Sequence, residues 1–320
     1  MKIITKLFWS DDECRIRALW RLVLQLLMWL IITIILLLVS QTIVIGTKIA
    51  TKEQFDNLEI IPEAIGALLA VWVASRLLDR RKFVEFGMHF NKDWWCDFGF
   101  GLFLGGFLIT AIFLIELTCG WVTITGTFAT GNPDNVFAVA ILFPILIFLL
   151  IGFEEELFFR GYILTNIAEG LNWKHFDSRW AVVIATILSA SLFTFLHANN
   201  PNASAISAFS VFLGGIILAL GYILTGEMAI SIGFHITWNF FQASVFGFTV
   251  SGEDFNAATI FAIRQHGPEL WVGNAFGPES GILALGAVLL GCLLILLWVH
   301  LRYGRVRLHT TIAEAPERLT

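Results

Sequence analysis

Residues 144–164 read PILIFLLIGFEEELFFRGYIL, and this stretch decides the fold. Apolar side chains fill both of its ends, while three consecutive glutamates and one arginine lie between them. A helix that crosses a hydrocarbon core of ~30 Å needs roughly 20 mostly apolar residues, and this stretch has that length. Ionisable side chains inside such a helix are costly, and they mark a functional site by default. The stretch therefore predicts a membrane-spanning helix with a polar site in its interior.

The composition of the whole chain agrees with a membrane protein. Of its 320 residues, 57% are hydrophobic and only 14% are charged, whereas soluble domains carry roughly 25% charged residues. A globular protein of this length exposes too much surface to hide so many apolar side chains. The formal net charge of −5 offers no basic surface to nucleic acid. The composition excludes a disordered chain, a secreted disulfide scaffold and a nucleic-acid-binding protein.

The expected fold class is all-α, a polytopic membrane helical bundle of about eight transmembrane helices. The predicted spans are 20–45, 60–78, 96–117, 137–168, 180–197, 204–223, 229–250 and 280–300. The first is expected to be a retained span, because its apolar run is longer than that of a signal peptide and no cleavage site follows it promptly. Glycines such as Gly101 and Gly105 predict that some of these helices pack closely.

Lysine and arginine concentrate on the cytoplasmic side of membrane proteins, and this bias predicts the orientation. With the N-terminus inside, the residues counted on the cytoplasmic side include Arg80, Arg81, Lys82, Lys92, Arg160, Lys174 and Arg179, and those on the outer side are Lys48, Lys52 and Arg264. We therefore expect an integral multi-pass protein of the plasma (inner) membrane, with both termini in the cytoplasm.

The acidic patch contains an expected ion pair and an expected free carboxylate. Glu156 and Arg160 are four residues apart, so they share a helix face and can pair. Glu155 is rotated ~100° from Glu156 along the helix, which leaves it free to face a cavity. A free carboxylate suits a general base or acid. The alternative is that Glu154, Glu155 and Glu156 simply mark the cytoplasmic end of a span.

Two further helices carry isolated polar residues. His197 ends the run ILSASLFTFLH, where it either belongs to the site or caps the span near Asn199 and Asn200. His235 and Asn239 are four residues apart and lie on one helix face. Side chains of this kind in lipid turn toward the bundle interior. The alternative for them is an interhelical hydrogen bond that only holds the bundle together.

These residues carry a resemblance to a known family. Glu155 to Arg160 resembles the EExxxR motif of the CPBP intramembrane proteases, a family that includes the type II CAAX prenyl endopeptidases and abortive-infection proteins. The segment from Phe193 to His197 looks like the FxxxH motif of the family, and the segment from His235 to Asn239 looks like its HxxxN motif. The three motifs occur in the expected order on successive helices, within residues 137–250.

The resemblance implies an endopeptidase whose site lies within the membrane. Glu155 would be the base that activates water, with His197 helping to orient it. His235 and Asn239 would stabilise the oxyanion, while Glu156 and Arg160 would support the geometry. Peptide hydrolysis needs these functions: a deprotonated water, a stabiliser of the oxyanion and a proton for the leaving amine.

The resemblance also implies a division of the chain. Residues 1–136 would hold three N-terminal membrane helices, residues 137–250 the protease-like core, and residues 251–320 an outer loop, the last span and a cytoplasmic tail. In the outer loop, Trp271 and Phe276 suggest an aromatic anchor at the membrane interface, with a substrate gate as the alternative.

No cofactor is expected to be required. The family has been described both as metalloproteases and as glutamate-type proteases, so zinc is the alternative, with Glu155, His197 and His235 as its ligands. An HExxH motif is absent from the sequence, and an asparagine such as Asn239 suits an oxyanion better than a fourth zinc ligand.

The expected partners are a protein or peptide substrate at the membrane and the lipid bilayer, with no nucleic acid. Alternatives to prenyl-protein processing are bacteriocin processing, self-immunity, or a non-catalytic scaffold or transporter that uses the Glu/His cluster as a proton relay. One structural condition must hold for the protease. The fourth helix has to extend to about residue 166 to bring Glu155 near the depth of His197 and His235.

Overall fold

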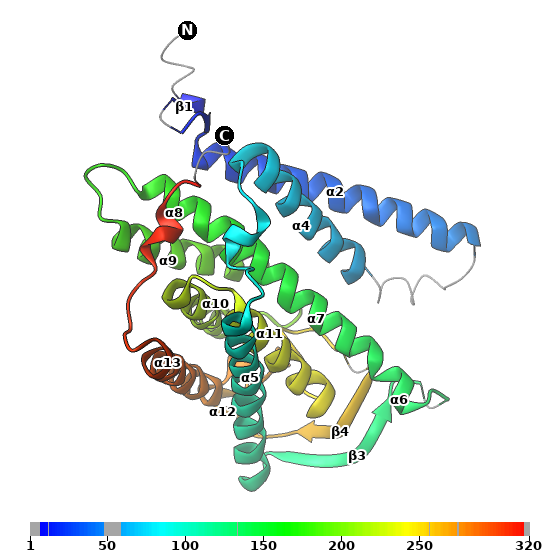
Figure 1. Cartoon of the computed structure of the whole chain (residues 1–320). Helices are drawn as coiled ribbons and strands as arrows, with labels where there is room; N and C mark the ends of the chain where they lie inside the picture. The colour runs from blue at the N-terminus through cyan, green and yellow to red at the C-terminus, as the bar shows by residue number, and fades with distance from the viewer. Residues whose placement is uncertain are drawn as a thin grey trace.

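The computed structural model of the chain describes residues 7–11, 13–47, 59–132, 134–255, 257–273 and 275–316. They form a bundle of long helices, with one small antiparallel sheet at each end (Figure 1). Seven helices within these ranges are long and apolar enough to cross a membrane. They are α2 (Ala18–Thr47), α4 (Ile60–Ala74) with the π-helical turn η1 (Ser75–Asp79), α5 (Lys92–Thr118), the long helix Phe137–Leu171, α9 (Ser178–Leu196), α10 (Ala205–Thr225) and α13 (Ile282–Tyr303). The all-α polytopic fold class is confirmed.

The predicted span at 229–250 is shorter than expected. α11 (Ala229–Phe240) continues as the π-helical turn η4 (Phe241–Val245), and together they do not qualify among the candidate spans of the described ranges. The residues from Ala229 to Ile236 are all buried, and α11 packs against α5, α7 and α10. Seven of the eight predicted spans therefore qualify within the described ranges, and the helical segment 229–245 is the exception because it is shorter than the predicted 229–250. Because other helices enclose it, it does not need the length that contact with lipid imposes.

The fourth predicted span is one continuous helix of 35 residues, Phe137–Leu171. It comprises α6 (Phe137–Ala140), α7 (Leu142–Glu156), the π-helical segment η3 (Leu157–Leu164) and α8 (Thr165–Leu171). Figure 1 shows it crossing the whole bundle from α8 to α6. π-Helical turns inside α-helices occur frequently at functional sites. The extension that the candidate site requires, beyond Glu154 to about residue 166, is confirmed.

The segments expected to be loops at 118–135 and 251–279 contain a sheet. β3 (Val122–Thr130) pairs antiparallel with β4 (Ala258–Gln265). The turn helices α12 (Glu269–Val272) and η5 (Pro278–Ser280) follow. Phe276 is only 1% exposed, so its expected role as an anchor at the membrane interface is wrong. The strand was missed because its pairing partner lies more than a hundred residues away, at a separation of 137 for one side-chain contact.

Glycines allow α5 and α11 to approach each other closely. A Cβ atom added at Gly105 would lie 2.4 Å from the carbonyl oxygen of Phe234, and one at Gly101 would lie 2.4 Å from that of Ile230. The close packing predicted for these glycines is confirmed, since no real Cβ fits at such distances. This contact places α11, and with it His235 and Asn239, inside the bundle.

We predict that Gly105→Ala destabilises the protein by about 1–3 kcal/mol, because the added methyl group forces α5 away from α11. The control is Gly99→Ala, since a Cβ at Gly99 meets nothing within 4 Å. Its effect should be neutral or stabilising, because alanine favours a helix more than glycine. Thermal unfolding in detergent measures both. Equal melting temperatures for the two variants would contradict the packing.

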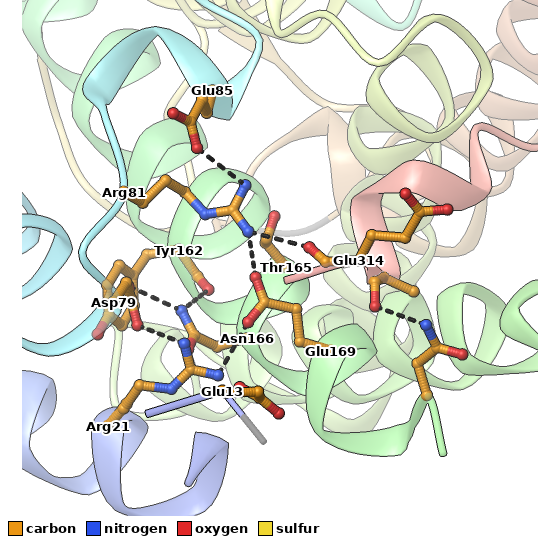
Figure 2. A network of polar contacts seen from close by, with 12 residues as sticks. Glu13, Arg21, Asp79, Arg81, Glu85, Tyr162, Thr165, Asn166, Glu169 and Glu314 are labelled. Carbon is orange, nitrogen blue, oxygen red and sulfur yellow. Dashed lines mark hydrogen bonds and ion pairs between the residues drawn. The ribbon is translucent and has the colours of Figure 1, made fainter. Parts of the chain in front are cut away.

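A buried ionic cluster holds one end of the bundle together (Figure 2). Arg21 of α2 donates to Asp79 of η1 over 2.8 Å and to Glu169 of α8 over 2.9 Å. Arg15, in the short strand β2 (Arg15–Ile16) that pairs with β1 (Trp9–Ser10), also reaches Glu169, over 2.7 Å. Arg81 completes the cluster through a third ion pair with Glu169. The cluster therefore joins the N-terminal segment, the turn after α4 and the long helix.

Two arginines counted in cytoplasmic loops are buried instead. Arg81 is 6% exposed and Arg160 is 1% exposed. Each is paired with a carboxylate, which offsets part of the cost of removing the charge from water. Lys48 and Lys52, counted on the outer side, lie outside the described residues. The orientation in the membrane stays a prediction.

We predict that Glu169→Gln destabilises the fold by about 3–5 kcal/mol, because it leaves buried arginines without their shared carboxylate. Glu85→Gln is the matched control. Glu85 also pairs with Arg81, over 3.9 Å, but its side chain is 32% exposed. Its loss should cost at most about 1 kcal/mol. Chemical or thermal unfolding in detergent compares the two, and a small effect of Glu169→Gln would show that the cluster contributes little.

Candidate active site

A buried carboxylate lies at the centre of the candidate site. Glu156, the last residue of α7, is 0% exposed. Its Oε1 atom accepts hydrogen bonds from Arg160 Nη1 over 3.0 Å and from His235 Nδ1 over 2.8 Å. The first is the pair predicted from the spacing of four, and it is confirmed. The second joins the long helix to α11, which no spacing along the chain indicates.

Arg160 is enclosed by two more helices. Its Nη2 atom donates to the carbonyl oxygen of Gly215 in α10 over 3.2 Å. Its guanidinium carbon lies 4.6 Å from the centre of the Phe193 ring in α9. A buried cation requires partners of this kind, and an aromatic face is one of them. The pair of Glu156 and Arg160 therefore connects α9, α10, α11 and the long helix at one point.

The side chain of Glu155 points toward a cavity and not toward Arg160. Its side chain is 20% exposed, against 0% for Glu156, and its Oε2 atom lies 3.6 Å from Nε2 of His235. The two nitrogens of His235 thus face two different carboxylates. Glu156 accepts from Nδ1 and fixes the orientation of the ring, while Nε2 faces Glu155. The prediction that Glu155 stays free of Arg160 agrees with this arrangement.

Glu155 and the other polar candidates line one cavity of about 440 Å³. Glu155 comes from α7, His197 from the end of α9, and His235 and Asn239 from α11. The opposite wall consists of residues of α2, α4 and the segment that follows Phe248. The three polar patches of the sequence therefore meet around a single space. Glu156 and Arg160 lie behind the wall that Glu155 and His235 form, and they do not line the cavity.

His197 both caps a helix and lines the cavity, the two roles between which the sequence did not decide. It caps the C-terminus of α9, and its backbone carbonyl accepts from the Asn200 N–H over 3.2 Å. Its ring donates from Nδ1 to the carbonyl oxygen of Phe193 over 2.8 Å. Because Nδ1 is used in this way, Nε2 is the ring nitrogen that remains for other partners. His197 is at once a helix cap and part of the cavity wall.

Residues 137–241 match the model of a family described as type II CAAX prenyl endopeptidase Rce1-like. The match covers this segment alone, and it supports membership of the CPBP family. The matched segment contains every candidate residue of the cavity and of the ion pair behind it: Glu155, Glu156, Arg160, His197, His235 and Asn239. Comparisons with curated proteins and with solved structures returned no match.

The matched family consists of CAAX-type proteases, which are hydrolases. Together with the seven apolar helices of the described ranges, it identifies an integral multi-pass membrane protein. The matched family and the apolar helices fit a protein or peptide substrate at the membrane. Two walls of the cavity, from α2 and from α4, lie outside the matched segment.

Glu155, His197 and His235 are the ligands that the zinc alternative would use. Within the described ranges, no three histidine, cysteine, aspartate or glutamate side chains are arranged to hold a metal ion. His235 and His197 each use Nδ1 in a hydrogen bond within the protein, which leaves both Nε2 atoms available to a metal ion or to a substrate. The expectation that no cofactor is required stays a prediction, and we derive no step through a metal.

The structure adds acidic residues that the sequence reasoning did not assign to the site. Glu63 of α4, Glu154 of α7 and Glu253 line the same cavity as Glu155. Glu63 is the single acidic residue in the predicted span 60–78, and this was the signal that could have identified it. Glu253 follows the last helix of the predicted core, so no periodic pattern relates it to the cavity.

Glu279 is a further carboxylate close to the site. It accepts hydrogen bonds from the side-chain amide of Gln242 in η4 and from the backbone N–H of Ser251. It also lines a smaller cavity of about 80 Å³ that His235 and Asn239 border from the other side. Burial raises the pKa of Glu279 to about 7. The residue anchors the segment before α13 to the end of the helix that carries His235 and Asn239.

We predict that Glu279 makes the stability depend on pH. The unfolded chain releases the proton of this residue near its usual pKa of 4.5, and the folded chain releases it near 7. The free energy of unfolding therefore falls as the pH rises through this window. Thermal unfolding from pH 4.5 to pH 8 should show a smaller slope for Glu279→Gln than for the exposed control Glu269→Gln. Equal slopes would contradict the assignment.

Proposed function

We propose that the protein is an intramembrane endopeptidase that hydrolyses a peptide bond of a membrane-associated or prenylated protein or peptide. The observation that supports it most is the position of His235, which lies between Glu155 at the cavity and Glu156 behind it. This places a free carboxylate and an imidazole on one open space of about 440 Å³. The family match to residues 137–241 supports the same reaction class.

In the proposed mechanism, Glu155 removes a proton from a water molecule in the cavity. The water then attacks the carbonyl carbon of the substrate, and the C–O bond forms as the carbonyl π electrons move to oxygen. General-base catalysis of this kind contributes roughly 10²–10⁴-fold to a rate. The C–N bond breaks when the tetrahedral intermediate collapses, and Glu155 returns its proton to the leaving amine.

His235 and Asn239 stabilise the oxyanion in this proposal. Nε2 of His235 donates to the oxyanion, while its Nδ1 stays hydrogen-bonded to Glu156 over 2.8 Å. The side-chain amide of Asn239, four residues further along α11, supplies a second donor. His197 helps to orient the water. Glu156 and Arg160 are positioning residues, because they act on His235 from behind the cavity wall.

We further propose that the protein resides in the plasma (inner) membrane with both termini in the cytoplasm, as the distribution of lysine and arginine suggests. The reaction uses no cofactor in this proposal. Zinc remains the alternative, and a chelator distinguishes the two.

The test is hydrolysis of fluorogenic peptides, with and without an S-farnesyl cysteine, by purified protein in detergent. We expect Glu155→Ala to lower kcat/KM by about 10²–10⁴-fold and His235→Ala by about 10²–10³-fold. The control Glu269→Gln, an exposed carboxylate outside the cavity, should keep wild-type activity. Dialysis against a strong zinc chelator should leave the rate unchanged.

Two outcomes would contradict the proposal. Equal activity of wild type, Glu155→Ala and His235→Ala would refute the site. Loss of activity after chelation, restored by zinc alone, would refute the metal-free mechanism. A farnesylated peptide that is cleaved much faster than its unmodified counterpart would identify prenyl-protein processing.

A further inference from the structure

The bundle has two distinct ends. The cluster end holds the ionic cluster and both termini, while the sheet end holds β3 and β4 (Figure 1). Contacts between helix ends define the cluster end. Arg21 at the start of α2 meets Asp79 at the end of η1 and Glu169 near the end of the long helix. Tyr303 at the end of α13 donates a hydrogen bond to Asp97 near the start of α5.

Positive charge is concentrated at the cluster end. In its described segments 7–17, 80–91, 172–177 and 304–316, the exposed lysine and arginine side chains are Arg17, Arg80, Lys82, Lys174, Arg305 and Arg307. In the described part of the sheet-end segments 119–136, 197–204 and 246–281, Arg264 is the only lysine or arginine. Membrane proteins keep lysine and arginine on the cytoplasmic side. This bias places the cluster end in the cytoplasm and the sheet end on the opposite side.

The cavity beside Glu155 has its exposed wall at the sheet end. The exposed residues that line it are Glu63 in the first turn of α4, Leu196 at the end of α9 and Glu253 beyond η4. α9 starts beside α8 at the cluster end and has 19 residues, so its two ends lie ~28 Å apart. None of the described lining residues belongs to the cluster-end segments. The mouth of the cavity therefore lies at the sheet end.

Packed side chains close the cavity toward the cluster end. The wall on that side includes Phe158, Phe159 and Phe193, which are all buried. They lie on the cluster side of Glu155 and His197, because the long helix runs toward α8 and α9 runs away from it. Beyond them, every residue of η3 is buried, in one hydrophobic core with residues of α9, α10 and α11. Protein interiors of this kind have few voids larger than a water molecule, so a peptide cannot pass through.

We infer that the substrate reaches Glu155 from the non-cytoplasmic side of the membrane. The substrate class is then a polypeptide segment that is presented on that side, while a tail on the cytoplasmic face is separated from Glu155 by the closed core. The mouth at the sheet end and the positive charge at the cluster end carry this inference together. It rests on the proposed endopeptidase function and adds the side of the membrane from which its substrate comes.

Two native cysteines report which end of the bundle lies outside. Cys14 lies between β1 and β2 at the cluster end, Cys119 follows α5 at the sheet end, and both are exposed. Each is kept alone in a chain that also carries Cys96→Ala and Cys292→Ala, and intact cells are treated with a membrane-impermeant maleimide. We expect Cys119 to be labelled, and Cys14 to be labelled only after the cells are permeabilised. Labelling of Cys14 in intact cells, or no labelling of Cys119 until permeabilisation, would overturn the inference.

A cysteine at the mouth connects the orientation to the cavity. In a chain without native cysteines, Glu253→Cys should be labelled in intact cells, and Lys174→Cys, the matched exposed position at the cluster end, only after permeabilisation. A bulky maleimide attached at Glu253→Cys should abolish hydrolysis of an added peptide, because it blocks the mouth. The same group at Lys174→Cys should leave hydrolysis unchanged. Full activity after complete labelling at Glu253→Cys would show that the substrate enters elsewhere and would overturn the inference.

Sealed right-side-out vesicles separate this inference from the proposed function. A membrane-impermeant peptide that the purified protein cleaves in detergent is either added outside the vesicles or enclosed in them. We expect hydrolysis of the added peptide and none of the enclosed peptide. Hydrolysis of the enclosed peptide alone would overturn the inference and leave the endopeptidase function standing. If the purified protein cleaves no peptide but the labelling pattern is as expected, the endopeptidase function fails and the cavity still opens to the non-cytoplasmic side.

Discussion

The hydrogen-bonded ion pair at Glu156 is the interaction on which the site depends. A carboxylate that is 0% exposed inside a membrane bundle is unfavourable unless cations compensate it. Arg160 and His235 both donate to the same oxygen atom, and Arg160 adds contacts to α9 and α10. The need to satisfy one buried charge therefore aligns four helices. It also holds the ring of His235 so that its other nitrogen faces the cavity.

The long helix gives two neighbouring residues different environments. Glu155 and Glu156 are adjacent in the chain, but rotation about the helix axis directs one to the cavity and the other to the interior. Their side chains are 20% and 0% exposed. This division requires the helix to continue past both residues, and it does so through the π-helical segment Leu157–Leu164. A helix that ended at Glu154 would leave both carboxylates in solvent.

The part of the chain outside residues 137–241 supplies the far wall of the cavity. The ionic cluster around Asp79 and Glu169 binds α2 and the end of α4 to the long helix. Through this attachment, Thr33, Trp29 and Glu63 reach the cavity and form its far wall. The core thus carries Glu155, His197, His235 and Asn239, while the attached helices close the cavity on its far side. Each buried charge of the cluster is paired with a group of opposite charge, so the cluster holds α2 and the end of α4 in position against the long helix.

Some features are local, and the sequence by itself determined them. The lengths of the spans other than 229–250, the pair of Glu156 and Arg160 and the shared face of His235 and Asn239 follow from helical periodicity and from the cost of charge in lipid. Contacts between distant segments required the tertiary structure. They include the bond from His235 to Glu156, the pairing of β3 with β4 and the enclosure of α11 as a short helix.

The sequence misled where the environment of a residue depends on contacts between distant helices. Arg160 and Arg81 look like loop residues when positive charges are counted along the chain. In the fold, both are buried and each is paired with a carboxylate. Glu63 looks like a stray charge in a span, yet it faces the cavity. Helical periodicity tells which residues share a face of one helix. Which face meets which neighbour depends on packing between helices, and only the folded chain decides that.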